Sequence, residues 1–241
     1  MTTAAVISIV LCATLVRATF GFGDALISMP LLSLLIDVRL AAPLVALVSA
    51  TTSVLIIERE WRNVELSAVR PLVLAAVVGV PIGVLYLKGA DEGVVKGLLS
   101  AIVICFSLYG LFASGSFSLT SDRWAWVFGF CAGVLGGAYN TYGPPLAIYG
   151  TLRKWQPSQF RANIQSCFLA AGVVVLCSHA YSGLWVASVL RNYIAALPVV
   201  IIANLVGRRV AGRVQAGKFV KYIYGLLILV GCMLAYQALG V

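Results

Sequence analysis

Two motifs that contain glycine and proline interrupt the apolar stretches of this chain, one in each half. The first glycine motif, residues 21–31, reads GFGDALISMPL, and the second, residues 136–146, reads GGAYNTYGPPL. Each begins with glycine and ends with a Pro-Leu pair at the same spacing. Glycine and proline interrupt regular helices, and an interrupted helix in a membrane exposes backbone groups that need a partner. One such break in each half is typical of a transport site.

Composition determines the class of protein. The chain has 241 residues, of which 61% are hydrophobic and only 10% are charged, whereas a soluble domain carries about 25% charged residues. So little charge cannot cover a surface in contact with water. No apolar segment alternates as a strand does, so we predict an all-α, polytopic membrane protein. The apolar segments cover, approximately, residues 4–36, 40–57, 68–88, 93–113, 124–152, 160–180, 184–207 and 219–239.

These eight segments form two groups of four, which we interpret as homologous repeats. The predicted N-terminal transmembrane repeat covers residues 1–113, a polar linker covers 114–123, and the C-terminal transmembrane repeat covers 124–241. Each repeat begins with an overlong segment that contains one glycine motif. An internal duplication explains this shared placement.

The overlong segments allow two arrangements. A helix of about 33 residues would be roughly 50 Å long, well beyond a membrane core of about 30 Å. Either each segment is one tilted, interrupted helix and the repeats share one orientation, or each is a re-entrant pair of half-helices and the repeats are inverted. The basic residues of the loops do not decide between the two. We favour the inverted arrangement because it makes better use of the glycine motifs.

The net charge of +9, from 17 basic and 8 acidic residues, does not indicate a nucleic-acid partner. Most of the excess lies in short loops, where basic residues set the orientation of a membrane protein. The largest basic cluster lies between Arg208 and Lys221, and we expect this loop to be cytoplasmic. Both arrangements then place both termini outside.

Cysteine and histidine provide no pattern for a metal site. The six cysteines include no C-x-x-C pair, and His179, the single histidine, is expected to face the outer water. We therefore expect no metal and no cofactor.

The chain resembles the TauE/SafE sulfite exporter family, also called the toluene sulfonate uptake permease family. The matching residues are Gly21-Phe22-Gly23 with Pro30-Leu31, Gly136-Gly137 with Gly143-Pro144-Pro145-Leu146, and Phe160-Arg161-Ala162-Asn163. The resemblance implies transport of sulfite, sulfoacetate or other sulfonates across the cytoplasmic (inner) membrane. Asp24 departs from the family pattern, which commonly has a small residue at this place, and Arg17 is also unusual.

Two charged residues belong to the first broken segment. Asp24 at membrane depth is a candidate for carrying a coupling proton; alternatively, it caps the following half-helix. Arg17 lies two helical turns earlier and is a candidate for binding a sulfonate or carboxylate through its planar guanidinium. The alternatives for Arg17 are a structural pair with Asp24 or a side chain that reaches to the interface.

The uncharged candidates are backbone and amide groups at the two motifs. Glycines there give a solute access to backbone amides and to helix N-termini, or they serve close helix packing. Asn140 and Thr141 offer hydrogen bonds to a solute, or they satisfy the backbone freed by the two prolines. Asn163 is a stronger candidate than Gln165, and Arg161 is either a binding residue or a charge anchor. The full set of predicted substrate-binding residues is Arg17, Gly21, Phe22, Gly23, Gly136, Gly137, Asn140, Thr141, Gly143, Arg161 and Asn163.

We therefore expect a secondary active transporter for small sulfur-containing or organic anions, with the proton as the simplest coupling ion. The substrate would lie between the two glycine motifs near the membrane midplane. An anion channel is the alternative, because broken helices also line pores. An intramembrane enzyme is less favoured, because the sequence has neither an H-E-x-x-H nor a G-x-S-x-G motif. The expected partners are the anion, the coupling proton and the lipid bilayer, and a homodimer is possible.

Overall fold

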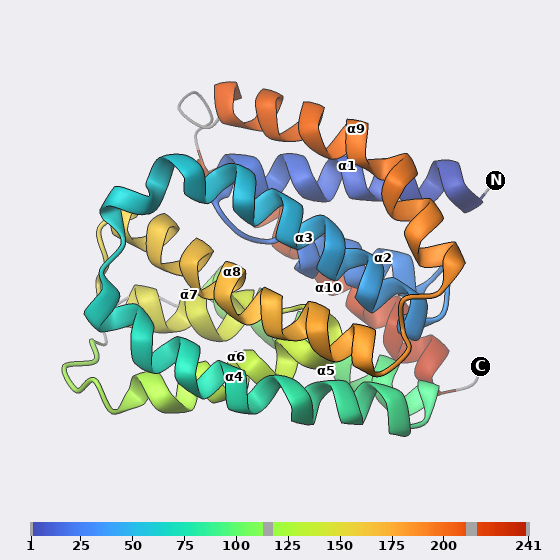
Figure 1. Ribbon diagram of the computed structural model, residues 1–241, viewed down its shortest axis with the longest axis horizontal. Coiled ribbons are helices and arrows are strands. Elements are labelled where there is room, and N and C mark those ends of the chain that lie inside the picture. Colours follow the sequence, from blue (N-terminus) through green and yellow to red (C-terminus); the bar gives the residue numbers. More distant parts are fainter. Residues whose placement is uncertain (1, 113–117, 211–215, 240–241) are drawn as a thin grey trace.

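The computed structural model describes residues 2–112, 118–210 and 216–239, and this part of the chain is helical without strands (Figure 1). The helices of the first half are α1 (Thr2–Phe20), α2 (Asp24–Ser33), α3 (Val38–Glu60), the 3₁₀ helix η1 (Trp61–Asn63), α4 (Leu66–Gly89) and α5 (Glu92–Phe112). Those of the second half are α6 (Trp124–Tyr139), α7 (Gly143–Leu152), α8 (Pro157–Tyr181), α9 (Ala187–Val210) and α10 (Ala216–Ala238).

Both overlong segments are broken at the predicted motifs. The first divides into α1 and α2 around Gly21-Phe22-Gly23, and the second into α6 and α7 around Asn140-Thr141-Tyr142. Gly21 and Gly23 have φ angles of 88° and 105°, and Asn140 has a φ of 53°. This left-handed backbone stops each helix. In each pair the second helix runs back against the direction of the first (Figure 1).

The two halves have a similar succession of helix lengths. From α1 to α5 the helices have 19, 10, 23, 24 and 21 residues, and from α6 to α10 they have 16, 10, 25, 24 and 23. Figure 1 shows that each helix of the first half runs opposite to its counterpart in the second half. The chain begins α1 and ends α10 at the same end of the molecule (Figure 1).

The halves interlock instead of packing as separate bodies. Helix α4 packs against α6, and the counterpart of this contact, α9 against α1, is also present. Helix α3 packs against α8, and α5 packs against α10. Residues of both halves therefore surround the interior.

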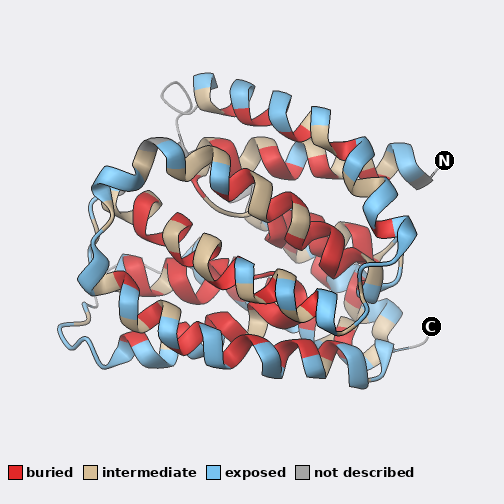
Figure 2. Ribbon diagram, viewed as in Figure 1, coloured by how far each residue is buried: buried red, intermediate tan, exposed pale blue. Residues whose placement is uncertain are grey.

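Six of the described helices, α1, α3, α4, α5, α8 and α9, are long and apolar enough to cross a membrane. Their outward faces carry exposed apolar side chains, among them Leu85 of α4 and Ile194 of α9, while the inward faces are buried (Figure 2). An apolar exterior of this extent suits contact with lipid. The protein is therefore a multi-pass membrane protein, as composition predicts.

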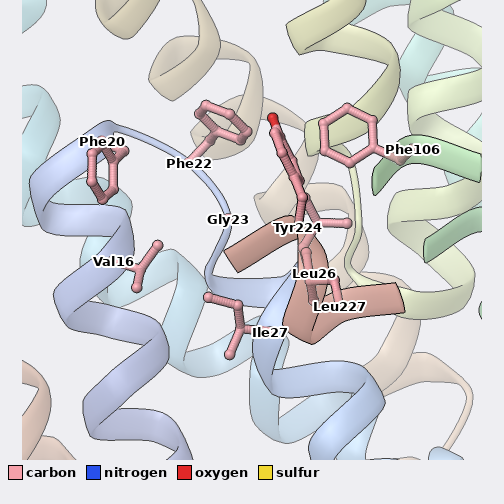
Figure 3. Close-up of a pocket in the computed structure, with 9 residues that line it drawn as sticks. All are labelled: Val16, Phe20, Phe22, Gly23, Leu26, Ile27, Phe106, Tyr224 and Leu227. Carbon is pink, nitrogen blue, oxygen red and sulfur yellow. The ribbon is translucent and has the colours of Figure 1, made fainter. Parts of the chain in front are cut away.

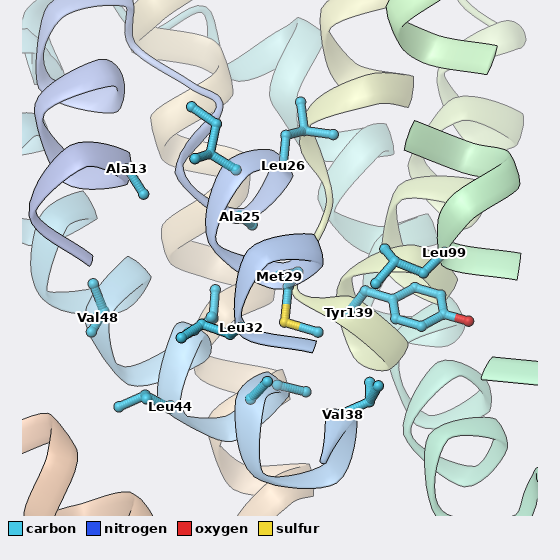
Figure 4. Packing of buried hydrophobic residues seen from close by; sticks show 14 of the residues in the cluster. Ala13, Ala25, Leu26, Met29, Leu32, Val38, Leu44, Val48, Leu99 and Tyr139 are labelled. Atoms are coloured by element: carbon cyan, nitrogen blue, oxygen red, sulfur yellow. The ribbon is translucent and has the colours of Figure 1, made fainter. Parts of the chain in front are cut away.

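Helix α2 lies inside the molecule, where its first residues are shielded from solvent. Nine of its ten residues are buried. Met29 and Leu32 of α2 pack in one cluster with Leu44 of α3 and Leu99 of α5 (Figure 4). Asp37 supports the following turn, because its side chain accepts a hydrogen bond of 2.6 Å from the backbone N–H of Arg39 at the start of α3. The packing thus fixes the position of the α2 N-terminus in the interior.

Glycines bring the backbones of α4 and α6 into direct contact. A Cβ placed on Gly133 of α6 would lie 2.2 Å from the carbonyl oxygen of Ala76, and one on Gly83 of α4 would lie 2.0 Å from that of Val134. Gly137, a predicted binding residue, belongs to the same contact, since its Cβ would lie 2.2 Å from the carbonyl oxygen of Val80. Gly137 therefore serves close helix packing, which was the alternative to a role in substrate binding.

Candidate functional site

Arg17 and Asp24 form an ion pair inside the protein. Arg17 lies in the last turn of α1 and Asp24 begins α2. The positive φ angles of Gly21 and Gly23 turn the chain between them, so the Arg17 Nη1 atom lies 2.6 Å from Asp24 Oδ2. The two side chains are 0% and 5% exposed. Each charge offsets the cost of burying the other.

Polar side chains from α3 and α8 complete the environment of Arg17. Nη1 also donates to the hydroxyl of Ser49, and Nη2 donates to Ser53 Oγ at 2.5 Å and to Gln165 Oε1 at 2.8 Å. The Ser49 hydroxyl in turn donates to Asp24 Oδ2 at 2.6 Å. The ring of Phe168 lies 4.9 Å from the guanidinium carbon, within the range of a cation–π contact. We call Arg17, Asp24, Ser49, Ser53 and Gln165 the Arg17 network.

Gln165 connects the second half of the chain to the first break. Its side-chain amide nitrogen donates to the carbonyl oxygen of Gly21, while its oxygen accepts from Arg17. Asn163, which was the stronger candidate on sequence grounds, does not hydrogen-bond to Arg17 or Gly21. Its Oδ1 accepts from the backbone N–H of Glu65 at 2.8 Å, just before α4. The structure therefore brings Gln165, and not Asn163, to Arg17.

Aromatic and basic side chains at the start of α8 cover the first break. Phe22 and Phe160 stack edge to face, with 6.0 Å between ring centroids. The aliphatic part of Arg161 packs on Gly21, where an added Cβ would lie 2.9 Å from Arg161 Cγ. The Arg161 guanidinium pairs with Glu60 at 3.4 Å. Arg161 therefore contacts the motif with its stem and an acidic residue with its charge.

The polar residues of the second break bond to the backbone. The Asn140 side chain donates to the carbonyl oxygen of Val45 at 3.4 Å, and the Thr141 hydroxyl donates to that of Tyr139 at 3.0 Å. The Tyr142 ring occupies the space beside Gly136, whose added Cβ would lie 1.9 Å from it. In this state of the protein, these side chains stabilise the turn between α6 and α7.

The two breaks lie close together in the interior of the protein. A Cβ placed on Gly143 would lie 3.8 Å from Phe22 Cδ2 and from Leu26 Cδ1. Phe168 lies between the breaks, because its ring contacts Arg17 and is also 5.6 Å from the ring of Tyr142. Side chains of the two breaks are therefore in contact with one another.

An apolar cavity of about 160 Å³ lies against the first break (Figure 3). Helix α1 contributes Val16 and Phe20, the break contributes Gly23, and α2 contributes Leu26. Phe106 of α5 and Tyr224 of α10 form the opposite wall. The cavity thus lies beside the N-terminus of α2.

The single histidine does not face the outer water, contrary to expectation. His179 is fully buried, and its Nε2 atom lies 3.3 Å from the carbonyl oxygen of Gly137. Helix α8 turns this residue toward α6, although it lies close to the helix end. Within the described residues, no three His, Cys, Asp or Glu side chains are placed to hold a metal ion.

A family model described as sulfite exporter TauE/SafE matches residues 6–234. The chain belongs to the TauE/SafE sulfite exporter family. It is also 26% identical over 233 residues to a protein of Cupriavidus necator described as a probable sulfite/organosulfonate exporter TauE, covering 94% of this chain and 91% of the relative. No solved structure matches the chain.

In this TauE/SafE family member, the spacing of Arg17 and Asp24 indicates a possible pair, whereas the signals for the residues around the pair are weaker. Ser49 and Ser53 lie one turn apart on α3, and this i, i+4 spacing is the signal that they share a face. Gln165 and Phe168 have a similar i, i+3 relation on α8. Nothing in the sequence indicates that these two helices meet at Arg17, because that contact depends on the packing of α3 against α8.

Proposed function

We propose that this member of the TauE/SafE family is a secondary active transporter that moves small sulfur-containing or organic anions, such as sulfite and sulfonates, across the cytoplasmic membrane. The observation that carries the proposal is the buried Arg17–Asp24 pair at the first break, bonded to residues of both halves. A cation buried with a titratable partner provides one site for an anion and one for a proton.

Competition between the Asp24 carboxylate and the anion for Arg17 couples proton transport to anion transport. All four terminal N–H groups of Arg17 have protein acceptors while Asp24 is ionised. When Asp24 takes up a proton, the Arg17 charge loses its counter-ion, and a buried cation without a partner is costly. An oxygen of sulfite or of a sulfonate then replaces the carboxylate at Nη1. A proton and an anion therefore move together.

The start of α2 supplies further donors for the anion. Gly23 precedes this helix and provides no side-chain cap, so the first amides and the positive end of the helix dipole are directed toward the break. Helix α7 is a poorer donor, because Pro144 and Pro145 at its start lack N–H groups. We therefore assign the anionic group to the first break. Direct contact of the anion with Gly136, Asn140 and Thr141 stays a prediction.

We propose inverted repeats with re-entrant α1–α2 and α6–α7 pairs. Two observations support this proposal. Counterpart helices run in opposite directions (Figure 1). The contact of α4 with α6 also has an equivalent in the contact of α9 with α1. Movement of one repeat against the other would then expose the meeting point of the two breaks to each side in turn.

The same arrangement places both termini outside and the basic loop from Arg208 to Lys221 in the cytoplasm. Residues 211–215 of this loop lie outside the described residues. Single cysteines introduced at the Lys88 and Arg59 positions test the topology, because inverted repeats put the first outside and the second inside. Labelling by an impermeant thiol reagent in a background without native cysteines gives the answer.

Purified protein in liposomes tests the transport function. We expect saturable flux of sulfite or a sulfonate that an imposed pH gradient accelerates. Flux without saturation and only down the anion gradient would identify a channel. A complete lack of flux for sulfite and for every sulfonate tested would contradict the proposal.

A further inference from the structure

Transport of sulfite, which has no hydrocarbon part, does not explain the apolar cavity beside the first break. The cavity has a volume of about 160 Å³, and no charged side chain lines it among the residues that the structure describes. Gly23, the residue before α2, forms part of its wall (Figure 3). The space therefore lies next to the position that we assign to the anionic group.

Packing fixes the far wall of the cavity. The rings of Phe106 and Tyr224 stack edge to face, with centroids 6.0 Å apart. The Tyr224 ring also packs on Gly110, where an added Cβ would lie 2.3 Å from its Cζ atom. These contacts join α5 and α10 and hold the aromatic wall in place, so the cavity has a defined shape.

The volume and lining match a small hydrocarbon group. A cavity of about 150 Å³ lined by apolar side chains stays free of water and binds benzene, whereas a buried water needs two to four polar partners. The cavity here has a similar volume and an apolar lining, and it is partly open instead of fully enclosed. A benzene ring or a short alkyl chain therefore fits it better than water or a second charged group does.

We propose that this cavity is the subsite for the hydrocarbon part of an organic sulfonate whose anionic group binds at Arg17 and the start of α2. This inference rests on the proposed function and specifies its substrate class. It predicts that the protein prefers an aryl or short-alkyl sulfonate over sulfoacetate, because the carboxylate of sulfoacetate, its second anionic group, would be desolvated in the cavity. It also assigns specificity to the cavity residues Phe106, Tyr224 and Leu227.

A series of alkyl sulfonates tests the subsite on the unaltered protein. In proteoliposomes, methane-, ethane-, propane- and butanesulfonate compete with labelled sulfite, and the inhibition constant is measured for each. Each added methylene should tighten inhibition by up to about fourfold, the value for burying one CH₂ group. Benzenesulfonate should bind about as well as the longest of these. The gain should stop once the cavity is full, so dodecanesulfonate should bind no better than butanesulfonate.

Two substitutions of similar size separate the subsite from the rest of α10. Leu227 is buried and lines the cavity, whereas Leu229 on the same helix is exposed. Leu227→Phe should narrow the cavity and lower the preference for butane- over methanesulfonate by about tenfold. Leu229→Phe should leave this preference unchanged. Leu227→Ala, which enlarges the cavity, should move the optimum to longer chains.

The outcomes distinguish failure of the subsite from failure of the transport function. Sulfite flux with no gain along the alkyl series would overturn the subsite and leave the transport function intact. Inhibition that continues to rise up to dodecanesulfonate would identify a groove for lipid chains instead, and equal effects of the two phenylalanine variants would also overturn the subsite. If no anion is transported, binding of labelled benzenesulfonate to the purified protein decides: binding that Leu227→Phe weakens supports the subsite, and no binding overturns it.

Discussion

Gln165 and Arg17, which are 148 residues apart in the sequence, meet through a hydrogen bond of 2.8 Å in the interior. Gln165 also bonds the carbonyl oxygen of Gly21, so one side chain of the second half holds both the charge and the backbone of the first break. A movement of one half against the other must therefore alter the surroundings of Arg17. The hydrogen bonds of Gln165 therefore link the movement of the two halves to the proposed coupling of proton and anion transport.

Replacing Gln165 with leucine should impair both stability and transport. The change leaves a buried N–H of Arg17 and the Gly21 carbonyl without a partner, which costs about 1–3 kcal/mol for each buried polar group. We expect a lower unfolding temperature in detergent and at least a tenfold loss of sulfite flux. Ser166→Ala is the matched control, since the neighbouring Ser166 hydroxyl donates to the carbonyl oxygen of Ala162 within its own helix. Equal flux in the two variants would contradict the role of Gln165.

Removing the Ser49 hydroxyl should weaken the Arg17 network more than removing that of Ser53. The Ser49 hydroxyl accepts from Arg17 and donates to Asp24, whereas the Ser53 hydroxyl accepts from Arg17. Ser49→Ala should therefore cost about 1–3 kcal/mol of unfolding free energy, because it removes one hydrogen bond from each of two buried charged groups. Thermal unfolding of both variants measures the difference. A Ser49→Ala variant as stable as the unaltered protein would mean that the hydroxyl adds nothing to the pair.

The contact between α4 and α6 should not tolerate a side chain. A Cβ on Gly133 would lie 2.2 Å from the carbonyl oxygen of Ala76, so Gly133→Ala must push two helix backbones apart. We expect a loss of folded protein on size-exclusion chromatography, or a destabilisation of several kcal/mol, of the order seen for strong overpacking.

Gly172 provides the control for this change. It lies within α8, and an added Cβ would meet nothing within 4 Å. Gly172→Ala should therefore be neutral or slightly stabilising, since alanine is favoured over glycine in a helix by about 1 kcal/mol. A Gly133→Ala variant that behaves like Gly172→Ala would show that the two backbones are not in contact.

The sequence predicts the helix breaks and the charged pair because both depend on local properties. Glycine and proline interrupt helices wherever they occur, and the spacing of Arg17 and Asp24 places them on either side of one break. The surroundings of the pair could not be predicted, since Ser49, Ser53 and Gln165 reach Arg17 only through the packing of α3 and α8. The burial of His179 depends in the same way on the contact of α8 with α6.

Replacing Asp24 with asparagine should separate anion binding from proton uptake. The variant mimics the protonated acid, so Arg17 keeps its charge without an ionised partner at every pH. We expect methanesulfonate, whose charge does not change across this pH range, to bind at least as tightly as in the unaltered protein, with an affinity that no longer changes with pH. Isothermal titration across a pH series measures this. Asp122→Asn is the control, because the Asp122 side chain is 81% exposed and its pair with Arg153 contributes little.

Proton movement during anion flux tests the central claim most directly. Liposomes that contain the protein and a trapped pH dye receive a sulfonate gradient, with the same pH on both sides and the membrane potential clamped at zero. We predict that the lumen acidifies as the sulfonate enters, and that Asp24→Asn carries the sulfonate without acidification. Sulfonate entry with no change of luminal pH in the unaltered protein would contradict the coupling of anion and proton at Arg17 and Asp24.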